Sequence, residues 1–93
     1  MTAIDNAYLL IQTDFANDLA AGKPILLDRP FIAKIEAIFD SFRQDYLTGW
    51  HQISLKLDHA YGYHKFIWSH GENGYLVTEM IFCRNDLDPW GHI

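Results

Sequence analysis

The sequence predicts an α+β fold in which two N-terminal helices form a helical hairpin and pack on one face of a three-stranded antiparallel sheet, in the order ααβββ. Two observations lead to this prediction. Apolar residues recur at helical spacing in the first half of the 93-residue chain, whereas the second half holds strand-like runs separated by turn-forming residues. The length suits one domain and no internal repeat is visible, so we expect residues 1–93 to form a single α+β domain.

The first predicted helix extends from about Ala3 to Ala21. Thr2 and Asp5 have the spacing of a capping box, in which a hydroxyl and a carboxylate bond the first unpaired amides of a helix. Gly22 is a natural residue to end the helix, because it adopts a positive φ without strain. The residues of the apolar stripe are Ile4, Tyr8, Ile11, Phe15 and Leu19.

The second predicted helix begins after Asp28, a good N-cap residue, and ends at Thr48-Gly49. Pro30 falls in its first turn, where the missing amide hydrogen costs nothing. The apolar stripe has a clear 3.6-residue period and contains Phe31, Ile35, Ile38, Phe39, Phe42 and Tyr46. The segment Lys23–Leu27 between the two helices is expected to cross the edge of the core as a short connector.

The pattern changes to strands in the second half of the chain. Gln52–Leu57 alternates strictly between polar and apolar residues, which predicts a strand with one buried face, followed by a turn at Asp58–Gly62. His64–Ser69 is the second predicted strand, and Gly71–Gly74 is a hairpin loop. Tyr75–Cys83 is the third strand. It is apolar on both faces, which indicates either a central strand or one covered by a partner.

Composition excludes several classes of protein. The chain is 49% hydrophobic, too apolar for a disordered protein, yet it has no uninterrupted apolar run long enough to span a membrane. Its 12 acidic and 7 basic residues give a net charge of −5, which disfavours direct binding to nucleic acid. A single cysteine and a start without a basic region predict a cytoplasmic protein without a secretory signal.

Motifs for catalysis, phosphate binding or metal binding are missing from the sequence, so we expect neither an enzyme nor a cofactor. The histidines leave one alternative open. If His59, His64 and His70 converged in space, the chain would be a small histidine-using enzyme or a metal-binding protein, because zinc takes three or four such ligands. Cys83 lies in an apolar strand and is expected to be a small buried hydrophobic residue.

Aromatic and acidic residues of the second half predict a surface for another protein, because interfaces are enriched in Tyr and Trp. The predicted partner-binding residues are Trp50, Asp58, Tyr61, Tyr63, Glu72, Asp86, Asp88 and Trp90. The preferred hypothesis is an acidic inhibitor of the immunity-protein or antitoxin type that covers a basic effector, such as a nuclease. A regulatory homodimer that uses the sheet or the first helix is the other alternative; on that helix, Leu9 and Leu10 are apolar residues that fall off the stripe.

Overall fold

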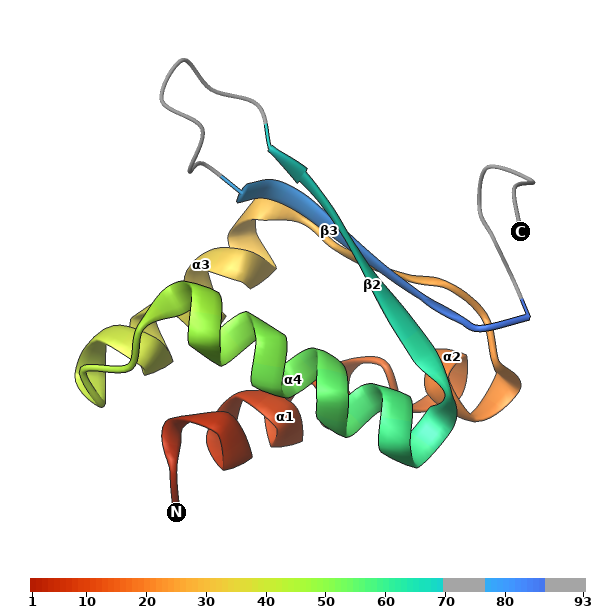
Figure 1. The fold of residues 1–93 in the computed structure, drawn as a ribbon, viewed down its shortest axis with the longest axis horizontal. Helices are drawn as coiled ribbons and strands as arrows, with labels where there is room; N and C mark the ends of the chain where they lie inside the picture. Colours follow the sequence, from red (N-terminus) through yellow and green to blue (C-terminus); the bar gives the residue numbers. More distant parts are fainter. Residues whose placement is uncertain (70–76, 87–93) are drawn as a thin grey trace.

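The computed structural model of the chain describes residues 1–69 and 77–86, which form four helices and three strands (Figure 1). In chain order the elements are α1 Ala3–Asp14, α2 Ala16–Ala21, β1 Ile25–Leu27, α3 Arg29–Ser41, α4 Tyr46–Tyr61, β2 Tyr63–Ser69 and β3 Val77–Arg84. Within the described residues, no helix is both long enough and apolar enough to cross a lipid bilayer. The predicted α+β class is confirmed, whereas the predicted order of elements is not.

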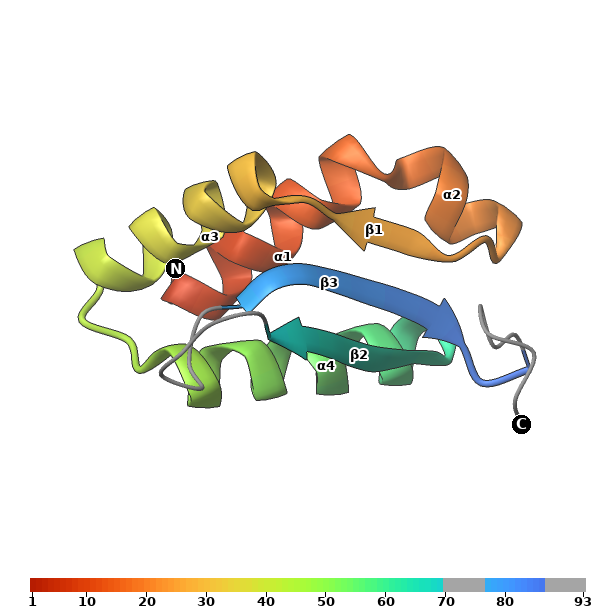
Figure 2. The same cartoon turned by 90° about the horizontal axis from the view of Figure 1, so that it is seen from above.

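The sheet has the strand order β1-β3-β2, and β3 pairs antiparallel with both neighbours (Figure 2). The predicted antiparallel sheet is confirmed, as is the central position considered for its last strand. β1 pairs Ile25 with Phe82 and Leu27 with Met80, and all four side chains are buried. Leu26 lies between the two buried residues of β1 and is 49% exposed. This period of two shows that one face of the sheet packs on the core.

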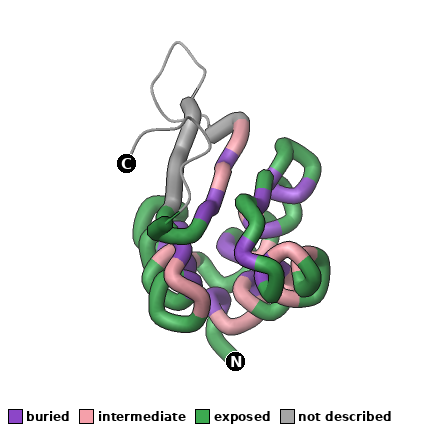
Figure 3. Tube along the Cα trace, turned by 90° about the vertical axis from the view of Figure 1, so that its right-hand side faces the viewer, coloured by how far each residue is buried: buried purple, intermediate pink, exposed green. Residues whose placement is uncertain are grey.

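The helices enclose the core from the other side. Helix α3 contacts β3, α4 contacts β2, and α1 packs against both of these helices. Buried residues lie on the sides of the helices and strands that face one another, as the burial colouring in Figure 3 shows. The largest fully buried side chains include Phe39 of α3, Trp50 of α4 and Phe82 of β3. Because α1 sits between two helices, both of its flanks are helix–helix contacts.

The predicted helix starts are confirmed by their hydrogen bonds. The Thr2 hydroxyl accepts from the Asp5 amide at 3.1 Å, and the Asp5 carboxylate accepts from the Thr2 amide at 3.2 Å, which completes the capping box. These bonds to Thr2 hold the pKa of Asp5 below its usual value. At α3, the Asp28 carboxylate accepts from the Phe31 amide at 3.0 Å. Local sequence therefore set both helix starts correctly.

The single helix predicted over Ala3–Ala21 is broken in the structure. Phe15 has φ −121° and ψ 25°, outside the helical region, and separates α1 from α2. Its ring packs edge to face on Phe31, with centroids 5.1 Å apart. No glycine or proline marks the break, so a tertiary contact rather than a local signal accompanies it. Gly22 ends α2 with φ 72°, as predicted.

The predicted order ααβββ is wrong at two places. Ile25–Leu27 forms strand β1 instead of a connector, and three residues are too few for periodicity to identify a strand. Gln52–Leu57, predicted as a strand, belongs to helix α4. Ile53 and Leu57 are fully buried, whereas Leu55 is 54% exposed. The alternation was therefore part of a four-residue helical spacing and not of a strand.

The end predicted for the second helix at Thr48-Gly49 is also wrong, because α3 ends at Ser41. Arg43 adopts a left-handed φ of 54°, and the Gln44 amide donates to the Phe39 carbonyl at 2.8 Å. Together with the bond from the Arg43 amide to the Asp40 carbonyl at 3.1 Å, this is a Schellman closure of the helix. An arginine in the position usually taken by glycine hid this helix end in the sequence.

Helix α4 has caps of its own that the strand prediction overlooked. The Asp45 carboxylate accepts from the Thr48 amide at 2.9 Å, and these bonds lower the pKa of Asp45. The predicted turn Asp58–Gly62 is the last turn of α4, closed by Gly62 at φ 76°. Beyond it, the predicted strand His64–Ser69 is confirmed within β2. The predicted hairpin loop and the last residues of the chain lie outside the described residues.

Candidate functional site

Two of the predicted partner-binding residues, Trp50 and Tyr63, lie in the core. Trp50 is 2% exposed and packs edge to face on Phe39, with centroids 5.5 Å apart. Tyr63 is fully buried, and its hydroxyl lies 2.7 Å from the carbonyl of Lys23 and 3.2 Å from that of Asp18, to which it donates. The sequence predicts both residues at the surface, whereas the structure buries both of them. Trp50 lies on the core side of α4, and Tyr63 lies on the core side of β2.

Asp58, Tyr61 and Asp86 come together near the C-terminal end of α4. Asp58 is exposed, and its carboxylate accepts from the Asn85 side-chain amide at 3.5 Å. Asp86 is also exposed and forms an ion pair with Arg84 at 3.2 Å. Tyr61 is half-buried, and its hydroxyl accepts from the Gln12 side-chain amide of α1 at 3.1 Å. This end of the molecule presents two carboxylates, while the tyrosine is held against α1.

The remaining predicted partner residues, Glu72, Asp88 and Trp90, lie outside the described residues. His70 does too, so the convergence of the three histidines is not tested. His59 and His64 are both exposed, on α4 and β2 respectively. Residues 1–69 and 77–86 contain no group of three His, Cys, Asp or Glu side chains that could hold a metal ion.

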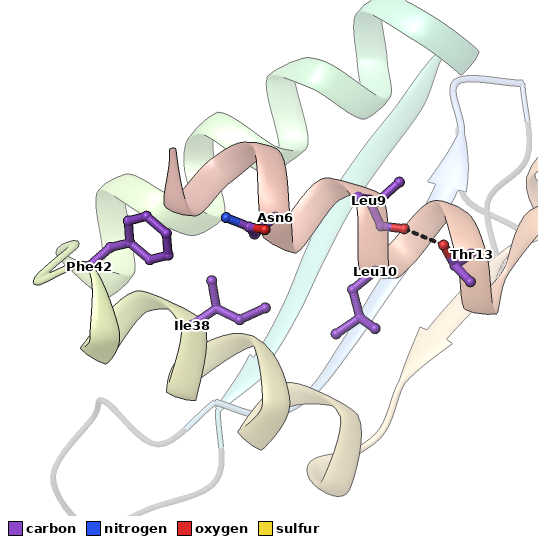
Figure 4. A pocket seen from close by; sticks show the side chains of 6 residues that line it. All are labelled: Asn6, Leu9, Leu10, Thr13, Ile38 and Phe42. Carbon is purple, nitrogen blue, oxygen red and sulfur yellow. Dashed lines mark hydrogen bonds between the residues drawn. The ribbon is translucent and has the colours of Figure 1, made fainter. Parts of the chain in front are cut away.

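An apolar groove lies between α1 and α3. It has a volume of about 500 Å³ and is lined by Asn6, Leu9, Leu10, Thr13, Ile38 and Phe42. Leu10 and Ile38 face each other across it, and Phe42 lies at the end beside the start of α1 (Figure 4). Leu9 is 50% exposed and Phe42 46% exposed. Large apolar side chains are thus left in contact with solvent on two opposite walls.

The sequence builds this groove by placing apolar residues beyond the core stripe. On α1 the buried positions are Ala3, Ile4, Ala7 and Ile11, so Leu9 and Leu10 point away from the core centre or to its edge. On α3, Ile38 is only partly buried although it belongs to the predicted stripe. The apolar surface of both helices is therefore wider than the core needs. Leu9 and Leu10 were visible as off-stripe residues in the sequence, whereas their meeting with α3 was not.

A second hollow, between α1 and α4, has a different chemistry. It has a volume of about 300 Å³ and is lined by Tyr8, Leu55, Lys56, His59 and Ala60. The Lys56 ammonium lies 5.3 Å from the centroid of the Tyr8 ring and 3.8 Å from an Asp5 carboxylate oxygen. Burial, followed by the neighbouring Tyr61, raises the pKa of Tyr8. Lys56 already contacts the Tyr8 ring and the Asp5 carboxylate. The hollow is therefore occupied by interactions between residues of this chain.

Charge is distributed unevenly around the apolar groove. Residues 1–22, which include α1 and α2, contain Asp5, Asp14 and Asp18 but no lysine, arginine or histidine. Asp14 and Thr13 are exposed at the end of α1, beside the groove. Asp5 is paired with Lys56 of α4 and Asp18 belongs to α2, so Asp14 is the carboxylate that lies at the groove end of α1, and a positively charged neighbour is favoured there.

Among the described residues, Tyr46 at the start of α4 has a strongly raised pKa with a defined cause. Its hydroxyl donates to the Asp40 carboxylate at 2.7 Å, and this bond, followed by burial, raises the pKa of Tyr46 from 10 to about 12. Its ring packs on Phe39, with centroids 5.9 Å apart. The phenol is therefore held protonated at neutral pH and does not supply a base.

Alkaline titration is expected to show this bond. The tyrosinate absorbance of Tyr46 is identified as the part that a Tyr46→Phe variant lacks. In the folded native chain it should titrate near pH 12. In the Asp40→Asn variant its midpoint should move toward pH 10. Because the folded pKa is the higher one, the stability from this bond is complete below pH 10 and is lost as the pH rises toward 12. A Tyr46 that titrates near pH 10, while circular dichroism shows an intact fold, would contradict the contact.

Comparison of the chain with protein-family models, with curated proteins and with solved structures found no match.

Proposed function

We propose that this chain is a small acidic protein-binding protein that neutralises a basic partner by covering its surface, in the manner of an immunity protein or an antitoxin-type inhibitor. The observation that carries the proposal is the apolar groove, whose half-exposed Leu9 and Phe42 belong to a chain with a net charge of −5. Exposed apolar surface of this kind is typical of sites where another molecule docks. A nuclease-like effector is the class of partner that the acidic charge favours.

Charge and apolar surface have separate roles in this mechanism. A net charge of −5 speeds the encounter with a basic partner, because complementary fields steer diffusion. Burial of apolar side chains then slows dissociation, since this is the term that holds most complexes together. Binding is thus expected to be fast at low ionic strength and to persist once formed.

The acidic end near the C-terminus of α4 is a second contact in this proposal. Asp58 and Asp86 are exposed there and would occupy positions on the partner that otherwise receive phosphate groups. Tyr61 lies beside them but is held by Gln12, so it would contribute only its exposed edge. Glu72, Asp88 and Trp90 remain part of the predicted surface.

A homodimer is the competing function, and one observation favours it. Leu9 is half exposed on α1, where the sequence suggested an unpartnered apolar face. Sedimentation of the isolated chain separates the two ideas, because a stable dimer without any other partner would replace the proposal.

Co-expression provides the test of neutralisation. Affinity capture from the native cell, at low and at high salt, would identify proteins that bind the chain in a salt-dependent way. Expression of that protein alone in a bacterial host is expected to arrest growth, and co-expression with this chain to restore it. A captured partner that is acidic, or a basic one that is harmless when expressed alone, would overturn the proposal.

A further inference from the structure

We infer that the apolar groove between α1 and α3 is a docking site for one amphipathic helix of a basic partner protein. The inference rests on the proposed function and adds to it the location of the contact and the kind of element that is bound. Helices that dock in this way insert apolar residues spaced three or four positions apart. The lining residues extend from Asn6 to Thr13 on α1 and from Ile38 to Phe42 at the end of α3, so a third helix laid between them would complete a three-helix contact.

The two polar side chains of the groove, Asn6 and Thr13, each donate a hydrogen bond to a backbone carbonyl four residues earlier. The Thr13 hydroxyl donates to the Leu9 carbonyl at 2.8 Å, and the Asn6 side-chain amide donates to the Thr2 carbonyl at 3.0 Å. The other lining side chains are apolar. Small-molecule sites usually add a few polar groups that fix the orientation of a ligand. With those donors engaged, the groove is better suited to apolar side chains than to a polar small molecule.

Net charge favours a partner helix over a second copy of this chain. The side chains of residues 1–22 include three aspartates and no lysine, arginine or histidine, so two α1 helices brought together would place like charges across the contact. Each copy would also add its net charge of −5. A helix with lysine or arginine beside its apolar face meets the opposite charge instead.

The two walls also set the orientation of the bound helix. On α3 the exposed Lys34 precedes Ile38 by one turn and therefore lies on the same side of the helix. The α1 wall ends at Asp14, which is exposed and acidic. The basic edge of the partner helix is therefore expected over α1, and its acidic or neutral edge over α3.

Peptide titration monitored by the methyl resonances of this chain tests the inference. The probe is a designed amphipathic peptide of about four helical turns, with leucines on one face and lysines beside them. A matched peptide has glutamates in place of the lysines. The variants are Leu9→Ser on one wall and Phe42→Ser on the other. Leu26→Ser on β1 is the control, because Leu26 is 49% exposed, as Leu9 is 50% exposed, but does not line the groove.

Binding of the lysine peptide should shift the methyl resonances of Leu9, Leu10 and Ile38. Either groove variant should weaken it at least about tenfold, since a buried leucine or phenylalanine contact is lost, while Leu26→Ser leaves it unchanged. Equal binding of the glutamate peptide, or equal weakening by the control, would overturn the inference. So would a concentration-dependent dimer of the chain that Leu9→Ser abolishes. Thermal melts show whether each variant is folded, and the two groove variants provide independent tests.

The outcomes also separate the inference from the proposed function. If a growth-arresting basic partner is neutralised equally well by the Leu9→Ser and Phe42→Ser variants, the function stands and the groove is not its site. If the lysine peptide binds as expected but no such partner exists, the groove is a helix site and neutralisation is wrong.

Discussion

Replacement of Gly49 by alanine is expected to destabilise the chain by about 3 kcal/mol, a large loss for a domain of this size. A Cβ at this position would lie 2.6 Å from Phe39 Cζ and 2.8 Å from Phe39 Cε1, closer than van der Waals contact allows. The Phe39 ring has little room to move, because Trp50 and Tyr46 pack against it at 5.5 and 5.9 Å between centroids. Gly49 therefore sets how closely α4 can approach α3.

The sign of this effect makes it diagnostic. Glycine to alanine in the interior of a helix normally stabilises by about 1 kcal/mol, so a gain in the free energy of unfolding would contradict the contact. The control is the double variant Gly49→Ala with Phe39→Leu, which removes the end of the ring. If the clash is the cause, alanine should cost much less in the Phe39→Leu background than in the native one. Urea unfolding of the four chains gives this coupling directly.

Truncation of Trp50 to alanine is expected to cost about 3–5 kcal/mol, because it leaves a large cavity in the core. Trp50 is 2% exposed and contacts Phe39, at the junction of α3 and α4. A tryptophan on a partner-binding surface would instead be lost with little effect on stability. Thermal or urea unfolding of the isolated chain therefore separates the core position from the surface position that the sequence predicts.

Trp50→Phe is the matched control for this experiment. Among the described residues, the Trp50 indole nitrogen is buried and has no hydrogen-bond acceptor. Phenylalanine removes this unsatisfied donor, which offsets part of the cost of the smaller side chain. The loss should therefore be well below that of Trp50→Ala. Equal losses in the two variants would contradict the expected benefit of removing the indole nitrogen.

The sequence predicts correctly those features of the fold that depend on neighbouring residues. The caps at Thr2 and Asp28, the glycine end at Gly22 and the strand His64–Ser69 all depend on short-range chemistry. Helix α4 was missed because Leu55, an exposed leucine, completed an apparent alternation with Ile53 and Leu57. Only the pairing partner β3 defines β1 as a strand. Information that comes from distant residues could not be obtained from periodicity alone.

In the candidate site, too, the sequence indicates local features but not contacts between distant residues. The sequence marked Leu9 and Leu10 as apolar residues outside the helix stripe, and the structure leaves Leu9 half exposed. It could not show that Ile38 and Phe42 would line one groove with them, because the packing of α3 against α1 decides that arrangement. Trp50 was predicted at the surface because the helical spacing of α4 was not recognised. The misplacement of Trp50 therefore follows from the error in one element, whereas that of Tyr63 follows from the side of β2 on which it lies.

Binding kinetics with the captured basic partner test the central claim most directly. For the native chain, the association rate is expected to fall with rising salt, because the acidic chain is steered to its partner. Leu9→Ser should keep that salt dependence but dissociate at least about tenfold faster, whereas Leu26→Ser should behave like the native chain. Identical dissociation rates for all three chains, or an association rate independent of salt, would contradict an acidic protein that docks through the apolar groove.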